Sequence, residues 1–318
     1  MTGYIIKRLI RGTITIFIAV TITFVLLRMM PGDPINVMVD PRMGSEMREQ
    51  MIIRFGLDRP LLVQYFHYIR NILTGNLGFS FYYRRPVHHV IFARLPWTIL
   101  LMGTAQFMTI LIGIPLGVIA GYKKGSVFDH AINAFAIFGI AIFIPWLGII
   151  LLNLFGHQIP IFPIGGAHAP RLTGLQYYKS VLHHLVLPVI SLMIIMIANY
   201  TLFMRSSIID VISQDYIRTA RSKGVSERQV LLIHALRNAL LPTLTMAGLM
   251  IGRMAGGAVL TETIFAYPGL GRMIYEAVSQ QDFPVLQGAF LILAFSVVFV
   301  NIVTDLLYAY LDPRIELN

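Results

Sequence analysis

The sequence predicts an all-α protein that crosses a membrane several times. Of its 318 residues, 56% are hydrophobic and only 13% are charged, which is unusual for a soluble domain. Several windows of about 20 residues contain no Asp, Glu, Lys or Arg, and a helix needs about that length to cross a hydrocarbon core of about 30 Å. Transmembrane strands are shorter and alternate in hydropathy, so unbroken apolar runs of this length predict helices.

Six apolar segments are expected to form the transmembrane helices. By residue number they are 9–30, 95–122, 131–155, 184–204, 240–260 and 285–310. Pro115, Pro145 and Pro188 lie inside these segments, and membrane helices tolerate proline where neighbouring groups satisfy the freed carbonyls. The fifth segment is the least regular because Arg253 interrupts it.

Lysine and arginine predict the orientation of these helices, because short cytoplasmic loops are enriched in both. A cytoplasmic amino terminus places twelve basic residues of short segments inside and three outside. The inner set is Lys7, Arg8, Arg11, Lys123, Lys124, Arg205, Arg218, Arg221, Lys223, Arg228, Arg237 and Arg314, and the outer set is Arg171, Lys179 and Arg272. Segment 31–94 would lie outside with eight arginines, which long loops permit. Both termini are therefore expected in the cytoplasm.

The chain is expected to divide into four parts. The first helix is retained, because no small-residue cleavage site follows it. The outer region after it has helical patterns near 46–55 and 63–73 and a turn at Gly75-Asn-Leu-Gly78. By residue number the parts are 1–30 (cytoplasmic segment and first helix), 31–94 (extracytoplasmic cap), 95–310 (five-helix transmembrane core) and 311–318 (cytoplasmic tail).

A polar, basic segment inside the core is the most informative part of the chain. It reads Asp215-Tyr-Ile-Arg-Thr-Ala-Arg-Ser-Lys-Gly224 and continues from Ser226 to Pro242. Gly224 should divide it into two short helices, the second opened by a capping box of Ser226 and Gln229 and followed by Pro242 at the start of the next span. Helices this short do not persist alone in water. This favours a docking surface for a cytosolic partner over a basic loop that only fixes topology.

Two charged residues of the fifth span are candidates for the translocation path. Arg253 lies well inside the span, where a charge costs about 2.5–3.5 kcal/mol, so it should face a cavity or a partner. It could meet an anionic group on the cargo, or it could extend to the outer headgroups. Glu262 lies at the outer end of the span and could touch a protein that delivers the cargo.

Histidines on the outer side could bind a transition metal such as nickel. Interfacial histidine is the commoner explanation, because no carboxylate or helical spacing fixes a coordination geometry, and we predict no metal site. The residues are His67, His88, His89, His157, His168, His183 and His184.

Catalytic signatures are absent from the sequence. It contains no phosphate-binding Gly-x-x-x-x-Gly-Lys-Ser/Thr loop, no His-Glu-x-x-His pair and no Gly-x-Ser-x-Gly elbow. It has no cysteine, which excludes disulfides and thiol catalysis. The formal net charge of +10 is explained by topology and anionic lipid, and no basic and aromatic module indicates nucleic-acid binding. We therefore predict no catalytic residue and no cofactor.

Short motifs along nearly the whole chain carry a family resemblance. They are Pro31-Gly-Asp-Pro34, Gly56-Leu-Asp-Arg-Pro60 with Gln64-Tyr65, Gly75-Asn-Leu-Gly78, the Asp215 to Gly224 stretch, His234-Ala-Leu-Arg-Asn238, Leu241-Pro242, Thr261-Glu-Thr-Ile-Phe265, Pro268-Gly-Leu-Gly271 and Asp305 to Pro313. With these motifs the chain resembles a permease subunit of an ATP-binding-cassette (ABC) importer, from the branch that carries dipeptides, oligopeptides, glutathione or nickel chelates.

The resemblance implies the type I (MetI-like) permease fold, a bacterial inner-membrane location and a transport subunit without ATPase activity of its own. It implies four kinds of partner: a homologous second permease, two ABC ATPase subunits, an extracytoplasmic solute-binding protein and the lipid bilayer. Segment 205–240 would be the coupling loop, which inserts into a cleft on an ATPase subunit. The coupling residues carried over are Asp215, Tyr216, Arg218, Thr219, Ala220, Arg221, Lys223, Gly224, His234, Arg237, Asn238 and Pro242.

Cargo stays open at this point. Peptides are the first expectation, with nickel chelates or glutathione as alternatives. Arg218-Thr219-Ala220 stands where the general importer pattern has Glu-Ala-Ala, a departure usual in the peptide branch that leaves the ATPase-contacting side chains open. A proton-coupled carrier would need deep titratable groups and inverted repeats, and neither is evident. A purely structural anchor would need neither Arg253 nor a docking loop.

Overall fold

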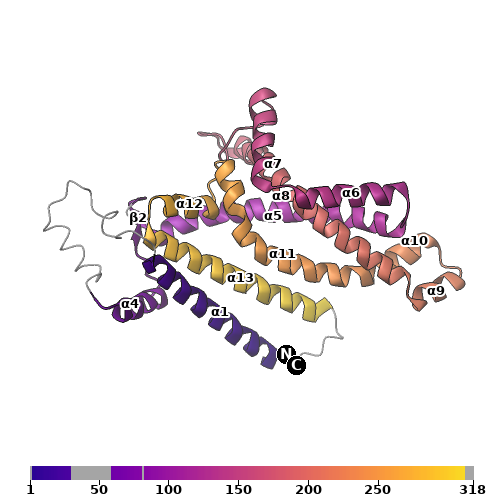
Figure 1. Ribbon diagram of the computed structural model, residues 1–318, viewed down its shortest axis with the longest axis horizontal. Coiled ribbons are helices and arrows are strands. Elements are labelled where there is room, and N and C mark those ends of the chain that lie inside the picture. Colours follow the sequence, from indigo (N-terminus) through magenta and orange to yellow (C-terminus); the bar gives the residue numbers. More distant parts are fainter. Residues whose placement is uncertain (1, 30–58, 81, 312–318) are drawn as a thin grey trace.

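Long helices dominate the protein and run along its longest dimension (Figure 1). The computed structural model describes residues 2–29, 59–80 and 82–311, leaving aside the side chains of 2–5, 244–245, 248–258 and 305–311. The long helices are α1 (Thr2–Met29), α5 (Val87–Tyr122), α8 (Gly174–Ile212), α11 (Leu236–Ile264) and α13 (Phe283–Leu311).

The predicted all-α, multi-spanning fold is confirmed. Over the described part of the chain, four helices are long and apolar enough to cross a membrane, and a bent pair of helices could make a fifth span. α11, with 29 residues, occupies the position of the predicted segment 240–260. α8 has 39 residues, so it extends beyond both ends of the predicted segment 184–204.

The third predicted span, 131–155, is not one straight helix. α6 (Val127–Ala141) and α7 (Ile144–Leu152), with its π-helical continuation η1 (Asn153–Gln158), meet at 96°. Pro145 lies in the first turn of α7. Proline has no N–H, and its ring would clash with the carbonyl of Ala141 if the helix continued. In Figure 1, α7 accordingly stands away from the direction of α6.

α5 and α8 pack closely against each other because glycines on α5 remove the side chains between them. A Cβ added at Gly117 would lie 2.6 Å from the backbone oxygen of Thr201, and one at Gly121 would lie 2.8 Å from that of Arg205. Gly113 lies one turn earlier, and its carbonyl accepts the Thr201 hydroxyl at 3.2 Å. This small-xxx-small spacing is how membrane helices approach closely, and it makes α5 and α8 one block.

Smaller elements gather at one end of the helices (Figure 1). α4 (Leu61–Leu73) confirms the helix predicted near 63–73, whereas the pattern at 46–55 lies outside the described residues. The two-residue strands β1 (Phe79–Ser80) and β2 (Arg85–Pro86) and the helix α12 (Leu270–Ser279) were not predicted. At this end α5, α12 and α13 bury a shared apolar cluster that includes Val87, Ile91, Leu270, Met273 and Leu286.

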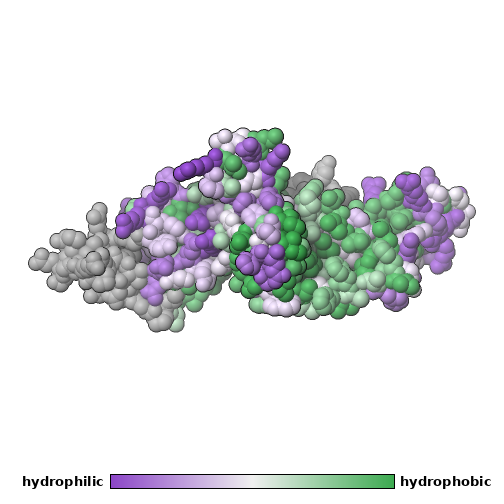
Figure 2. All heavy atoms as spheres, turned by 90° about the horizontal axis from the view of Figure 1, so that it is seen from above, coloured by the Kyte–Doolittle hydropathy of each residue, from purple (hydrophilic) through white to green (hydrophobic). Residues whose placement is uncertain are grey.

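The opposite end carries α9 (Asp215–Ser222) and α10 (Glu227–Gln229). The amino end of α1 and the carboxyl end of α13 point toward this end, away from α12 and β2 (Figure 1). On the face shown in Figure 2, hydrophobic side chains form a broad zone between the hydrophilic α9–α10 end and hydrophilic residues toward the other end. This zone is what a helix bundle presents to lipid.

Candidate coupling site

The candidate site is the segment 215–235, which we call the elbow. Its first helix, α9, ends at Gly224, whose φ of +77° places it in the left-handed region. The Gly224 N–H donates to the Arg221 carbonyl at 2.9 Å, and the Val225 N–H donates to the Ala220 carbonyl at 3.3 Å. This pair of bonds is the Schellman ending of a helix, for which glycine is preferred. The predicted break at Gly224 is therefore confirmed.

A small apolar core holds the elbow together. Ile217, Ala220, Val230 and Ala235 are buried against one another. Partly buried residues at the end of α8, including Val211, pack on the same cluster. Ala220 therefore faces its own chain, where its small side chain fits the core. The short helix α9 is stabilised by this packing, since isolated helices of its length are not stable in water.

The second half of the elbow differs from the prediction of a separate short helix. Ser226 Oγ accepts the Gln229 N–H at 3.4 Å and also lies 3.0 Å from Gln229 Oε1, so the predicted cap forms. α10 then passes through a π-helical turn, η2 (Val230–Ala235), directly into α11. Pro242 lies inside α11, so no break separates the elbow from the fifth span. The second half of the elbow is thus a continuous extension of α11.

A charged tie fixes the elbow to α5. Arg221 Nε and Nη2 donate to Glu227 Oε1 and Oε2 at 2.8 and 3.2 Å. The hydroxyl of Tyr122, the last residue of α5, donates to Glu227 Oε2 at 3.1 Å. Arg221, and after it Tyr122, lower the pKa of the Glu227 carboxyl. Arg221 is therefore engaged within its own chain.

The exposed face of the elbow combines basic and apolar side chains. Arg218 is 80% exposed, and its contact with Asp215 is long, at 3.6 Å. Tyr216, Leu232 and Ile233 are 42%, 48% and 58% exposed. Such a mixture of anchors and cations is the composition expected of a protein-docking surface. Thr219, Lys223, Arg237, Asn238 and Pro242 are also exposed, and His234 is partly buried.

Two of these polar side chains bind within the elbow region. Asn238 Nδ2 donates to the Tyr216 hydroxyl at 2.8 Å and to the His234 carbonyl at 3.2 Å, which links α9 to α11. Thr219 Oγ1 donates to the Asp215 carbonyl at 3.0 Å. Asn238 thus positions the docking face, and it leaves the cationic groups of that face available.

A buried ion pair lies at the root of the elbow. Arg205 on α8 donates from Nε and Nη2 to the two carboxylate oxygens of Asp129, at 2.5 and 2.8 Å. The Asp129 side chain is 1% exposed, and it also accepts the Gly125 N–H at 2.9 Å and Asn133 Nδ2 at 2.9 Å. The start of α6 is thereby fixed to α8 just before α8 enters the elbow.

Glu262, expected as a path or delivery contact, is buried at the other end of α11. It is 0% exposed. Its Oε1 accepts the Thr98 hydroxyl at 2.6 Å, and its Oε2 accepts the Arg272 N–H in the first turn of α12 at 3.0 Å. A Cβ on Gly269 would lie 2.2 Å from this carboxylate. The Glu262 carboxylate therefore caps α12 instead of lining a path or meeting a delivering protein, which corrects the expectation.

Two other expectations can be placed only in part. Arg253 lies on α11, but its side chain is outside the described ones, so its role stays a prediction. Among the residues that the structure describes, no three His, Asp or Glu side chains gather in a way that could hold a metal. The rings of His88 and His89 contact each other with centroids 4.3 Å apart and planes tilted by 36°, and His183 Nε2 lies 2.8 Å from the Ile161 carbonyl oxygen.

Comparison with known proteins gives matches over the whole chain. Residues 113–317 match the family described as the binding-protein-dependent transport system inner membrane component, and residues 1–102 match the amino-terminal region described for the same systems. The chain belongs to this family. It is 41% identical over 318 residues to the oligopeptide transport system permease protein AppB of Bacillus subtilis, covering 99% of this chain and 100% of that protein.

Other relatives of the permease agree with this assignment. It is 38% identical to the dipeptide transport system permease protein DppB of Escherichia coli K12 and 39% identical to the di/tripeptide permease DppB of Pseudomonas aeruginosa, covering 99% of each chain. A solved structure of the MetNI methionine ABC transporter matches with a TM-score of 0.55 at 14% identity, covering 71% of this chain and 97% of that one. At that identity the match supports the fold alone, which is that of an ABC importer permease.

Several residues that shape the permease's site were missed by sequence reasoning. The Gly113, Gly117 and Gly121 spacing was visible as a repeated glycine every four residues. Asp129 stands three residues after Ser126, which is the pattern of a helix cap. The link from Tyr122 to Glu227 crosses 105 positions of the chain, and no local pattern indicates it.

Proposed function

We propose that this permease forms half of the path by which an ABC importer carries di- and oligopeptides across a bacterial inner membrane. The observation that carries the proposal is the end-to-end similarity, 38–41% identity over 99% of the chain, to permeases named for oligopeptides and dipeptides. Peptides are chemically suited to a path with both apolar and hydrogen-bonding walls.

The partners of the complex follow from the family. A homologous second permease completes the path, two ABC ATPase subunits supply ATP hydrolysis, and an extracytoplasmic solute-binding protein delivers the peptide. The elbow, within the segment 205–240, is the ATPase-coupling loop. Its exposed Tyr216, Arg218, Leu232 and Ile233 support this assignment, because a small protein surface with both cations and apolar anchors suits a docking cleft.

The elbow is built to pass movement into the membrane. Its carboxyl side continues into α11, its amino side continues from α8, and Glu227 ties it to α5. Closure of the ATPase pair around the elbow would therefore shift α5, α8 and α11 together and alternate the access of the path. The elbow thus transmits movement, and the ATPase subunits, not the permease, hydrolyse ATP.

Orientation and domain limits complete the proposal. Both termini lie in the cytoplasm with the elbow, and residues 31–94 form the extracytoplasmic cap. The excess of Lys and Arg around the elbow and the termini supports this orientation, as does the direction of α1 and α13 in Figure 1. Residues 95–310 form the permease core. Within it, Arg253 lines the path and meets an anionic group of the cargo, such as a peptide carboxylate.

Transport by the purified complex tests the proposed cargo. The permease, its homologous partner and the ATPases would be reconstituted in vesicles with the solute-binding protein of the same transport system. Labelled dialanine, a pentapeptide, glutathione and nickel would be offered with ATP. We expect ATP-dependent uptake of peptides. Uptake of nickel or glutathione with no peptide uptake would overturn the peptide assignment. Loss of stimulated ATPase activity on replacing Arg218, with the complex still assembled, is the expected sign of coupling.

A further inference from the structure

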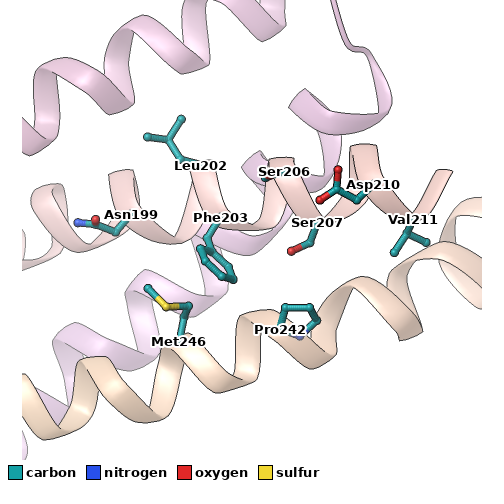
Figure 3. Close-up of a pocket in the computed structure, with 9 residues that line it drawn as sticks. All are labelled: Asn199, Leu202, Phe203, Ser206, Ser207, Asp210, Val211, Pro242 and Met246. Carbon is teal, nitrogen blue, oxygen red and sulfur yellow. The ribbon is translucent and has the colours of Figure 1, made fainter. Parts of the chain in front are cut away.

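A groove of about 450 Å³ lies between α8 and α11 beside the root of the elbow (Figure 3). Phe203, Ser207 and Val211 point from α8 toward Pro242 and Met246 on α11 (Figure 3). Seven of the nine lining residues come from α8. The full lining is Asn199, Leu202, Phe203, Ser206, Ser207, Asp210, Val211, Pro242 and Met246.

Hydrogen-bonding groups form a stripe along this groove. Asn199, Ser206 and Asp210 are spaced by seven and then four residues, which places them on one face of α8. Asn199 Nδ2 donates to the Ile195 carbonyl at 2.9 Å, which leaves the amide oxygen of Asn199 to accept from a ligand. Ser206 is exposed. The groove therefore offers polar groups beside the apolar side chains of Leu202, Phe203 and Met246.

Asp210, at the cytoplasmic end of the stripe, is an acidic residue at the carboxyl end of a helix, where basic residues are favoured. It lies in the last turn of α8, which contains no basic residue, and a carboxylate there is disfavoured by the negative end of the helix dipole. Among the described residues, no cationic side chain is paired with it, whereas Asp129 and Glu227 both have arginine partners. The Asp210 carbonyl accepts Ser213 Oγ at 2.7 Å and Gln214 Nε2 at 3.4 Å, so the negative group left at the mouth of the groove is the Asp210 carboxylate.

We propose that Asp210 binds the cationic amino terminus of a peptide in transit, while Asn199 and Ser206 hydrogen-bond its backbone. This inference rests on the proposed function and adds a specificity-determining residue to it. The ammonium group of a peptide would supply the cationic partner that Asp210 does not have within the described chain. Charge-assisted hydrogen bonds to a carboxylate are strong. Apolar walls of Leu202 and Phe203 accept varied side chains, so recognition falls on the ammonium common to all peptides.

Competition for a photoreactive dipeptide tests the assignment without the binding protein. The purified complex of permeases and ATPases would be irradiated with a dipeptide bearing a photoreactive side chain, and labelling of this chain would be competed by dialanine or N-acetyldialanine. We expect dialanine to compete about tenfold better in the wild type, as loss of one ionic contact implies. Asp210→Asn should remove this preference and Asp210→Glu should keep it. Asp210→Glu, which conserves the charge, is the matched control for Asp210→Asn.

The outcomes separate this inference from the proposed function. Equal competition by the two compounds in the wild type, or a preference that survives in Asp210→Asn, would overturn the role of Asp210. Loss of complex assembly in Asp210→Asn, with the preference intact in the complexes that remain, would assign Asp210 to a neighbouring subunit and also overturn it. Peptide uptake by wild-type vesicles is the separate readout, and failure of that uptake would overturn the proposed function itself.

Discussion

The Glu262 cluster (Thr98, Glu262, Gly269 and Arg272) and the elbow lie at the two ends of α11. Their sequence motifs are similar in composition, but their charged side chains are in different environments. At the end next to α12, the Glu262 cluster has its carboxylate fully buried and satisfied by its own chain. At the elbow, Arg218 is 80% exposed and its one close acid lies at 3.6 Å. Both motifs contain charged residues and glycine. In the Glu262 cluster the charge is buried and paired within the chain, whereas in the elbow the Arg218 charge is exposed to solvent.

This contrast teaches how to separate structural motifs from docking motifs. A polar group that is buried must have partners within the chain, because an unsatisfied one costs about 1–3 kcal/mol. A polar group that serves a partner must be held in place by other residues. Asn238 and the Arg221–Glu227 pair do this for the elbow. Substitutions in the Glu262 cluster should therefore destabilise the fold. Substitutions in the elbow should instead reduce coupling to the ATPase.

The largest expected effect is at Glu262. Replacing it by alanine leaves the Thr98 hydroxyl and the Arg272 N–H without their buried acceptor and removes the cap of α12. We expect a loss of about 3 kcal/mol in the free energy of unfolding. Unfolding in detergent, followed by Trp97 fluorescence in a Trp146→Phe background, would measure it, since Trp97 packs near the cluster with its ring centroid 6.0 Å from that of Tyr267.

The matched control for this variant is Glu227→Ala in the elbow. Its carboxylate is 51% exposed, so we expect a much smaller loss of stability than in Glu262→Ala, because exposed ion pairs contribute little. If the two alanine variants were equally stable, the distinction between the buried cluster and the open elbow would be lost.

Substitutions at Gly224 test why the elbow needs a glycine, with an expected effect of about 1 kcal/mol. A Cβ at this position would meet nothing within 4 Å, but φ is +77°. We therefore expect Gly224→Asn to retain more ATPase stimulation than Gly224→Ala, because asparagine tolerates the left-handed region better. The measurement is peptide-stimulated ATPase activity of the reconstituted complex.

The opposite order would have a clear meaning. If the glycine is needed so that the ATPase can approach closely, alanine, the smaller residue, should be tolerated better than asparagine. That result would replace the conformational explanation of Gly224 by a contact explanation.

The smallest expected effect concerns the Glu227 tie. The pKa of Glu227 is lowered in the folded protein, so the contribution of the carboxylate is present above its unfolded value of about 4.5 and is lost as pH falls through the lower folded pKa. A spin label at exposed Ser222 should become more mobile only below about pH 4.5. In Glu227→Gln the label should be mobile throughout. A wild-type label that is as mobile at neutral pH as the label in Glu227→Gln, or one released at pH 6, would show that the carboxylate does not hold the elbow.

Sequence reasoning succeeded where the physical cause is local. Apolar runs give long helices, Gly224 gives a helix end, and Ser226 with Gln229 gives a cap. It failed at Pro145, where a proline tolerated in principle actually bends the span by 96°. Pro242 was expected to mark a boundary, and α11 passes through it.

The remaining errors come from contacts between distant parts of the chain. Glu262 was an exposed candidate by position, but its partners Thr98 and Arg272 are supplied by α5 and α12. The pairing of Asp129 with Arg205 spans 76 positions, and each residue alone reads as a surface charge. Only packing decides which charges are buried, so the local pattern could not distinguish them.

Cysteine accessibility tests the central claim, that the elbow faces the cytosol and is covered by an ATPase. The chain has no cysteine, so Arg218→Cys and, as the outer-end control, Gln280→Cys each introduce a single thiol. The account predicts that a membrane-impermeant maleimide labels Gln280→Cys in right-side-out vesicles but labels Arg218→Cys only in inverted vesicles, and more slowly when the ATPase subunits are present. Labelling of Arg218→Cys from the outside, or at a rate that the ATPase does not change, would contradict the account.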